Sequence, residues 1–187
     1  MRPQKVQDKD IMMSLVKTFR SKGYDGASLA DLAESTGLKK ASLYHRFPKG
    51  KEEMATAVLK DIDEWVEEHI VKALMNENKT PIERLINGLD QIRTSYDGGK
   101  ESCIFRALSL GQSLELFDVH IKNGMNKWIT VFKNVGISFG LSDADALKQA
   151  MNTLIKIQGS LIVTKGLNDL SIFETTLKEI EDSYLKQ

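Results

Sequence analysis

The stretch that decides the fold is residues 29–47, LADLAESTGLKKASLYHRF. Its spacing is that of two short helices joined by a tight turn. Ala33 is small where the two helices must cross closely, and Gly37 can adopt the left-handed backbone that the turn requires. The apolar residues placed to wedge the helices together are Leu32, Leu38 and Leu43. The pattern predicts a rigid helix-turn-helix, whose second helix can enter a DNA major groove about 12 Å wide.

Residues flanking this stretch set the limits of its helices. Ser28 is typical of a helix N-cap, and Asp31 favours the start of the helix that follows. We expect the second helix of the chain at about 29–35 and the third at about 40–46. Pro48 must end the third helix, because proline cannot donate a backbone hydrogen bond and disfavours a helical residue before it.

The third helix is rich in hydrogen-bond donors. Those expected to project from it are Lys39, Lys40, Ser42, Tyr44, His45 and Arg46. Lys49 and Lys51 follow, and Lys51 lies where a helix is expected to begin, a place that favours a phosphate. Single residues have simpler interpretations: Tyr44 could lie at the edge of the core, Phe47 suits the core better than a contact, and one lysine could merely be solvated. Six donors on one short helix favour a nucleic-acid partner.

Charge is distributed unevenly along the chain, although 26 basic and 26 acidic residues balance overall. Residues 1–60 contain twelve Lys and Arg against seven Asp and Glu, a net charge of +5. Residues 61–187 contain 14 against 19, a net charge of −5. Chance clustering of solvated charges is the alternative. A basic head on an acidic body suits a protein that binds a polyanion at one end only.

Composition places the chain among ordinary globular proteins. Of its 187 residues 41% are hydrophobic and 28% are charged, so widespread disorder is not expected. The lone Cys103 cannot form an intramolecular disulfide, which suits a reducing cytosol. The first ten residues, MRPQKVQDKD, lack the apolar core of a signal peptide, and no run approaches the ~18 apolar residues of a membrane span. We therefore expect a cytoplasmic protein with no membrane partner.

Signals for the start and end of helices recur along the whole chain, which has only three prolines. Together they predict an all-α protein of about nine helices. Gly23 should end the first helix, and Ser142 should cap a late one. Thr80 to Glu83 and Ser171 to Glu174 have the pattern of capping boxes. The apolar stripes expected in the core are Met54, Val58, Ile62, Trp65 and Ala73; Ile82, Leu85, Leu89, Ile92 and Tyr96; and Leu147, Met151, Leu154, Leu161 and Ile162.

A resemblance to a known family rests on GLKKASLYHRFPKGKEEM, residues 37–54, and on FRSKGYDGASLADLAESTG, residues 19–37. These stretches resemble the helix-turn-helix signature of TetR-family regulators, and the likeness covers about residues 8–60. Three positions depart from the family pattern: Lys39 replaces a serine, Ala41 a glycine and Arg46 a histidine. Gly50 is an additional residue. The departures bear on the base contacts, and hence on the operator.

The resemblance implies a partner and the residues that contact it. The partner would be a palindromic double-stranded DNA operator, bound by a dimer, with no cofactor and no metal. Ser28 and Lys51 would contact phosphate, while Lys39, Lys40, Ala41, Ser42, Tyr44 and His45 would lie on the recognition helix. Residues 1–50 would form the DNA-binding domain, and residues 51–187 a domain for ligand binding and dimerisation. The function implied is a regulator, most simply a repressor, released by a small-molecule effector.

For the helical body, the family fold implies a ligand pocket enclosed by the fourth to seventh helices and a homodimer interface on the last two helices. The stripe Phe173, Leu177, Ile180 and Tyr184 suits a partner helix, although it could equally face its own core. Apolar walls with a few polar anchors are typical of small-molecule sites. The candidate pocket residues are Trp65, His69, Tyr96, Phe105, Arg106, Phe117, His120, Met125, Trp128, Phe132, Met151, Ile155 and Gln158.

Two other functions are alternatives to a regulator. A thiol enzyme would need a linked triad, but Asp118 and His120 are two residues apart and so point to different sides of a helix, with no motif joining them to Cys103. His69 lacks the histidine four residues away that a helical zinc site requires. We therefore expect no enzyme. A DNA-bound adaptor or activator that uses this fold without a ligand remains the alternative.

Overall fold

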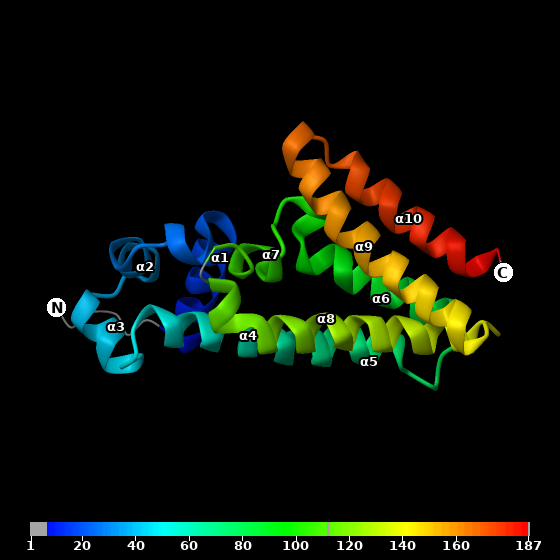
Figure 1. Ribbon diagram of the computed structural model, residues 1–187, viewed down its shortest axis with the longest axis horizontal. Helices are drawn as coiled ribbons and strands as arrows, with labels where there is room; N and C mark the ends of the chain where they lie inside the picture. Colours follow the sequence, from blue (N-terminus) through cyan, green and yellow to red (C-terminus); the bar gives the residue numbers. More distant parts are fainter. Residues whose placement is uncertain (1–6, 112, 187) are drawn as a thin grey trace. The chain divides into compact units, whose positions relative to one another are not determined.

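The computed structural model describes residues 7–111 and 113–186, and Figure 1 shows their path. When the π turn η1 and α5 are taken as the continuation of α4, and the 3-10 turn η2 is set aside, these residues form nine helices and no strand. The predicted all-α class is therefore confirmed. The elements are α1 (Asp8–Gly26), α2 (Leu29–Thr36), α3 (Lys40–Arg46), α4 (Lys51–Val66), η1 (Glu67–Val71), α5 (Lys72–Leu74), α6 (Pro81–Ser95), η2 (Asp97–Gly99), α7 (Ile104–Leu108), α8 (Ser113–Ser138), α9 (Asp143–Leu167) and α10 (Ser171–Leu185).

The chain divides into two compact units. The first, which we call the head, comprises residues 1–63 and 104–121, and the second, the body, comprises residues 64–103 and 122–187. Within the described part of the chain, no helix has the length and apolarity needed to cross a membrane. The head thus includes α7 and the start of α8 in addition to the N-terminal helices.

In the head, α1 packs against both α2 and α7 (Figure 1). The buried face of α1 carries Ile11, Leu15 and Phe19, at the four-residue steps of a helix stripe. Gly23 interrupts the helix with a φ of 71°, and a Cβ there would lie 3.3 Å from the Ala107 carbonyl oxygen. The predicted break at Gly23 is confirmed, because only glycine combines this φ with so close an approach.

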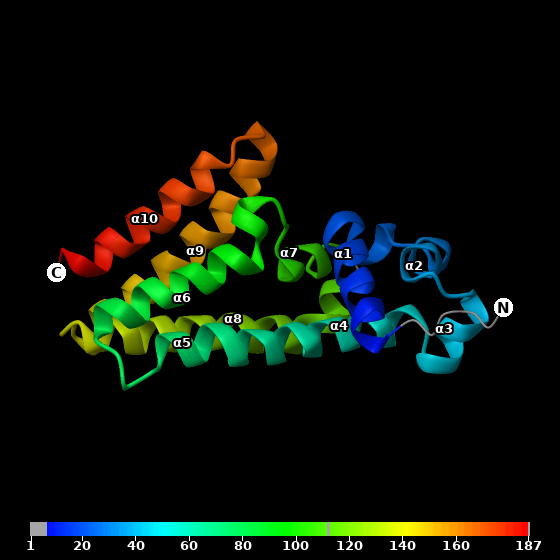
Figure 2. The same ribbon diagram turned by 180° about the vertical axis from the view of Figure 1, so that it is seen from behind.

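In the body, α10 packs along α9 and against α6 (Figure 2). Phe173, Leu177, Ile180 and Tyr184 on α10 are all buried within this fold. The expectation that this stripe meets a partner helix is therefore wrong, and the alternative that it faces its own core is correct. The Tyr184 hydroxyl lies 3.2 Å from Thr153 Oγ1, so its polar end is satisfied as well.

The start of α10 also differs from prediction. Thr80 and Ser142 cap α6 and α9 as expected, each accepting from the backbone N–H three residues later. Ser171, however, is the first residue of its helix and not the cap. Its backbone N–H and hydroxyl both donate to Asp169 Oδ1, at 2.9 and 2.7 Å. The predicted capping box is wrong because Asp169, two residues earlier, holds the turn instead.

The stripe predicted for α4 is correct only in its first half. Met54 and Val58 are buried, but further on the buried residues are Val66, Ile70 and Leu74, while Trp65 and Ala73 are only half-buried. Steps of four residues drift by about 40° each around an α-helix of 3.6 residues per turn. The π turn η1, where Lys72 N–H donates to Glu67 O, takes up this drift.

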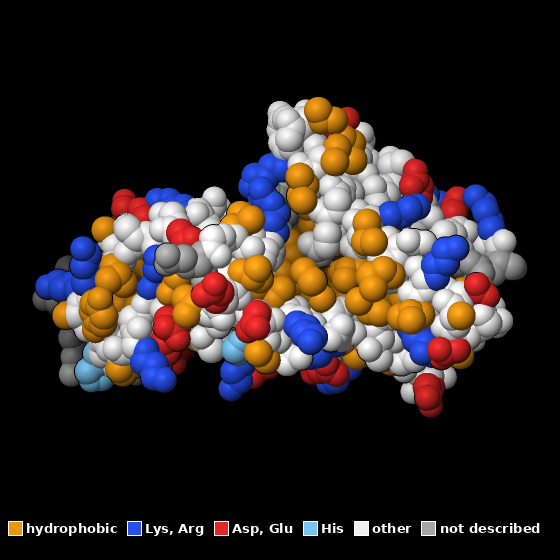
Figure 3. Space-filling model, viewed as in Figure 1, with side chains coloured by type: hydrophobic (Ala, Val, Ile, Leu, Met, Phe, Trp, Pro, Cys, Tyr) orange, Lys and Arg blue, Asp and Glu red, His pale blue; other side chains and the backbone are white. Residues whose placement is uncertain are grey.

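Exposure differs from prediction on two other helices. Ile82 on α6, and Leu147, Met151 and Ile162 on α9, were expected in the core but are exposed. Leu85, Leu89, Ile92 and Tyr96 on α6 are buried as predicted. Figure 3 shows hydrophobic side chains gathered along α9. One face of α9 is thus apolar without being covered by the body itself.

Candidate nucleic-acid interface

The helix-turn-helix is built around Gly37, as the sequence predicts. Gly37 has a φ of 67° and ψ of 13°, and its N–H donates to the carbonyls of Ala33 and Glu34. α3 spans Lys40–Arg46, the range expected from sequence, and α2 ends one residue later than expected, at Thr36. Leu32 and Leu43 are completely buried between the helices. The turn and the apolar wedge together fix the direction of α3.

Ser28 and Asp31 form a capping box at the start of α2. The Ser28 hydroxyl donates to Asp31 Oδ2 at 2.7 Å, and Asp31 N–H donates back to that hydroxyl at 3.1 Å. Lys22 Nζ reaches Asp31 Oδ1 at 2.5 Å, and its hydrogen bond, followed by those from Ser28, holds the pKa of Asp31 below its ordinary value. Ser28 therefore already has a structural task, and its contact with phosphate stays a prediction.

The outer face of α3 is open to solvent. Its exposed residues are Lys39, Lys40, Ala41, Ser42, Tyr44, His45 and Arg46. Leu43 and Phe47 point inward and are buried, which is the core role expected for Phe47. Tyr44 is 46% exposed and so is not a core residue. Lys, Arg and His side chains are visible around α3 in Figure 3. The predicted donors are thus all accessible to solvent on this short helix.

α3 begins without the residues that usually stabilise the start of a helix. Its preceding residue, Lys39, makes no side-chain cap, and its first turn contains no acidic residue. A missing cap costs about 1 kcal/mol, and a cation there opposes the helix dipole. Within the described residues, no ion pair involves Lys39 or Lys40. Locally unfavourable residues are expected where a site serves function and not folding.

Two of the predicted contacts already have protein partners. The Arg46 guanidinium forms an ion pair with Asp8 of α1. Lys51 Nζ donates to the Tyr24 carbonyl at 2.9 Å and lies 4.4 Å from the centre of the Tyr24 ring. Sequence reasoning did not identify Asp8 or Tyr24, because neither is close to its partner along the chain. Lys51 therefore joins the end of α1 to the start of α4.

The additional glycine has a clear local role. Gly50 has a φ of 68°, and a Cβ at this position would lie 3.3 Å from a carbon of the Tyr44 ring. Its carbonyl accepts from Met54 N–H at 3.1 Å, in the first turn of α4. The neighbouring Lys49 is exposed, and its backbone N–H donates to Glu53 Oε2 at 2.8 Å. Gly50 thus lets the Tyr44 ring lie against the backbone of this turn.

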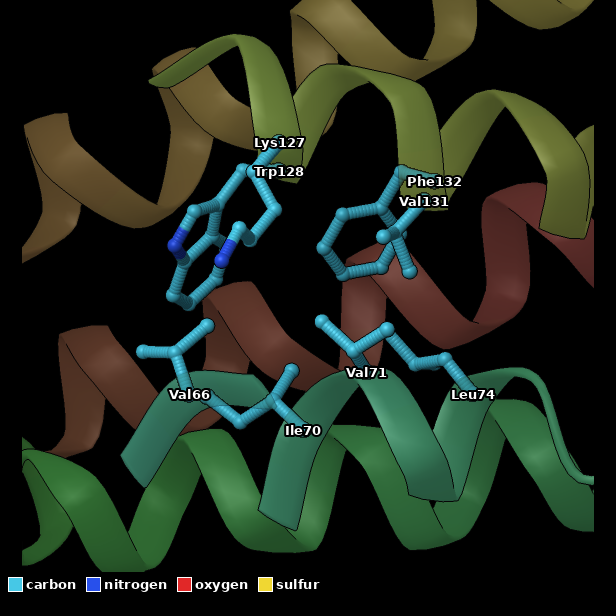
Figure 4. A pocket seen from close by; sticks show the side chains of 8 residues that line it. All are labelled: Val66, Ile70, Val71, Leu74, Lys127, Trp128, Val131 and Phe132. Carbon is cyan, nitrogen blue, oxygen red and sulfur yellow. The ribbon is translucent and has the colours of Figure 1, made fainter. Parts of the chain in front are cut away.

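In the body, two of the predicted ligand residues line a cavity. Trp128 and Phe132 of α8 face Val66, Ile70 and Leu74 across it (Figure 4). The cavity has a volume of about 10 Å³, which is space for about one water molecule. Val66, Ile70 and Leu74, on the opposite wall of the cavity, were not predicted from sequence. They are four residues apart, a spacing that keeps them on one face only because η1 is a π turn. The regular four-residue spacing of these apolar residues is the sequence signal that could have identified them.

The other candidate ligand residues of the body do not line this cavity. Trp65 and His69 stack on each other, with ring centres 4.4 Å apart, and His69 is exposed. Tyr96 is buried against Phe173. Of the remaining candidates, Met125 and Gln158 are half-buried, and Met151 and Ile155 are exposed.

The last candidates belong to the head. Phe117 is buried, with its ring centre 5.1 Å from that of Tyr24. Phe105 is half-buried, whereas Arg106 and His120 are exposed. Across the described ranges, no group of three or more His, Cys, Asp or Glu is placed to hold a metal ion. The ligand assignments for these residues stay predictions.

The fold and the exposed face of α3 define a helix-turn-helix DNA-binding protein. Residues 11–58 match the family described as "Bacterial regulatory proteins, tetR family". A TetR regulator from Legionella pneumophila has a similar structure, with a TM-score of 0.81 at 20% identity, over 98% of this chain and 99% of that chain. Residues 11–58 therefore carry the sequence pattern of the tetR family, and the chain has the fold of solved TetR regulators.

Three further proteins are similar to this chain. An uncharacterized HTH-type regulator of Lactococcus lactis subsp. lactis is 22% identical, over 94% of this chain and 92% of its own length. IcaR of Staphylococcus aureus strain Newman, a negative regulator of a biofilm operon, is 46% identical over 41 residues, 22% of each chain. The regulator CifR, in complex with 26-bp operator DNA, has a TM-score of 0.71 at 19% identity, over 95% and 98% of the two chains.

Proposed function

We propose that this regulator is a repressor that binds a palindromic operator as a dimer and dissociates when a small molecule enters the body. The observation that carries the proposal is the exposed, donor-rich face of α3 on a rigid turn. Recognition helices of this motif use such a face to contact base edges in the major groove. The residues proposed to contact DNA are Ser28, Lys39, Lys40, Ala41, Ser42, Tyr44, His45, Arg46, Lys49 and Lys51.

Repression and operator binding draw support from relatives. IcaR is named as a negative regulator, and CifR was solved with operator DNA. The chain would act in the cytoplasm by binding an operator and blocking transcription, with no catalytic step of its own. The shared helix-turn-helix region supports the mode of DNA binding, whereas the identity of the operator depends on α3 residues particular to this chain.

A dimer would require an apolar surface on the last two helices. Since the stripe of α10 is buried in the body, we place this surface on α9. Ile155 is 60% exposed, and Met151, Ile162 and Val163 are exposed along the same helix. A second copy is the natural partner, because a two-fold dimer presents two recognition helices at a spacing of about 34–36 Å, one turn of DNA.

Ligand release would be a population shift. A ligand that binds one conformation of the body more tightly than the other moves the equilibrium toward it, and by linkage DNA and ligand weaken each other's binding. The cavity at Trp128 and Phe132 would have to widen, because small-molecule sites commonly have 300–1,000 Å³. Its small volume also favours the alternative function, an adaptor or activator that uses this fold without a ligand.

The proposed function can be tested with a gel shift on DNA upstream of the protein's own gene and of neighbouring genes. We expect a retarded complex that survives an excess of random competitor DNA. Titration of candidate compounds into that complex then tests release. A compound that binds equally well with and without DNA would refute the coupling, and failure to retain any fragment over random competitor would refute the repressor.

A further inference from the structure

We infer that this protein reads its operator mainly through guanine, and that Lys39 and Lys40 are the residues that read it. The inference rests on the proposed function and adds to it the chemical class of base in each half-site. It follows from which donors on α3 are free, which are already held by the protein, and which acceptors the four base pairs offer.

The exposed face of α3 can donate far better than it can accept. Lys39, Lys40 and His45 offer N–H groups, and Ser42 and Tyr44 offer hydroxyls. The segment from Lys39 to Phe47 contains no carboxylate and no side-chain amide. Guanine presents two acceptors in the major groove, N7 and O6, which lysine and arginine recognise. Adenine is matched by Asn or Gln, and the cytosine amino group by Asp or Glu. This face is therefore suited to guanine.

Among the lysines and arginines from Lys39 to Arg46, contacts within the head leave Lys39 and Lys40 available. Arg46, the side chain best shaped for guanine, is held by Asp8, and Lys51 is held by the Tyr24 carbonyl and ring. Lys39 and Lys40 are exposed, and no ion pair with the described residues engages them. Lys39 immediately precedes α3 and Lys40 is its first residue, at the end of a recognition helix that reaches base edges.

The test begins with selection of bound sequences from a random duplex library by the full-length chain. In the selected site each guanine is then replaced, one at a time, by 7-deazaguanine, which lacks the N7 acceptor. Replacement of adenines by 7-deazaadenine is the matched control. Loss of one good base contact lowers affinity about 5- to 150-fold. We expect at least a fivefold loss at one guanine or more per half-site, and smaller losses at adenines.

Variants then assign the contact to residues. Lys39→Gln and Lys40→Gln remove a cation and supply the amide that suits adenine. At least one should bind the selected site more weakly and recover affinity when its guanine is replaced by adenine. Lys79→Gln, an exposed lysine between α5 and α6, is the control and should leave the preference unchanged. Circular dichroism of each variant establishes that it folds.

The possible outcomes separate this inference from the proposed function. If a specific site is selected but is insensitive to 7-deazaguanine, the guanine inference fails and the regulator stands. If both glutamine variants weaken all sequences equally and lower the salt dependence, these lysines contact phosphate and the inference fails. If no sequence is enriched at all, specific operator binding itself fails.

Discussion

The head and the body of this protein differ in how far local sequence determines them. In the head, α2 and α3 lie close to where the sequence predicts, because a capping serine, a glycine turn and a proline each act on their neighbours. In the body, the buried residues from Val66 to Leu74, the start of α10 and the covered face of α10 all differ from expectation. A binding surface is easier to infer where the residues that shape it are adjacent in sequence.

The largest effect is expected in the head, from Tyr44→Ala. The Tyr44 side chain is exposed on α3, and its ring lies against Gly50. Its removal should lower affinity for the operator about 100-fold and affinity for random DNA far less, as expected for a residue that contacts bases. Fluorescence anisotropy with both DNAs measures the ratio. Equal losses on the two DNAs would contradict a base-reading role.

A smaller effect, in the body, concerns Tyr184 at alkaline pH. Burial raises its pKa to about 12 from an ordinary value of 10.0. Because the unfolded chain ionises first, the contribution of the neutral hydroxyl is complete below pH 10 and is lost progressively between pH 10 and about 12. Across that range the free energy of unfolding should fall by about 2 kcal/mol more in the native protein than in Tyr184→Phe. Urea unfolding of both proteins from pH 9 to 12 measures it, and parallel curves would contradict it.

A packing test in the body comes next. A Cβ on Gly88 of α6 would lie 2.2 Å from a methyl carbon of buried Leu74. Gly88→Ala should therefore lower the free energy of unfolding by about 1–2 kcal/mol, as overpacking does. Gly166→Ala on α9 is the matched control, because its Cβ would meet open space and a helical alanine should be neutral or stabilising. Equal urea midpoints for the two variants would mean that α5 and α6 are not closely packed.

The smallest effect is expected for Lys51→Met. The ammonium has three N–H groups and gives one to the Tyr24 carbonyl, which leaves donors for a phosphate. Loss of one phosphate contact should weaken binding to all DNA a few-fold and reduce the slope of log K against log salt by about 0.9. An unchanged slope, with a lower free energy of unfolding, would show that Lys51 only joins α1 to α4.

The parts that could be predicted from sequence depend on neighbouring residues. The limits of α3, the turn at Gly37, the burial of Phe47 and the caps at Thr80 and Ser142 all follow from residues a few positions apart. The exposed donors of α3 follow from the same pattern. The sequence was therefore sufficient for the fold class and for the exposed, donor-rich helix α3.

What could not be predicted depends on distant partners or on unusual helix geometry. Asp8 holds Arg46 from 38 positions away, and Tyr24 holds Lys51 from 27 positions away. Ordinary α-helical spacing predicts that Trp65 is buried, whereas the π turn η1 places Val66 and Ile70 in the core instead. An apolar stripe on α10 is equally suited to its own core and to a partner, so the sequence alone does not distinguish the two.

The most direct measurement for the central claim is protection of lysines from acetylation, read by mass spectrometry, with and without the selected operator. If the open face of α3 enters the groove, Lys39 and Lys40 should react at least about tenfold more slowly in the complex, while Lys79, between α5 and α6, should react unchanged. Protection of body lysines, with Lys39 and Lys40 still fully reactive, would contradict the account.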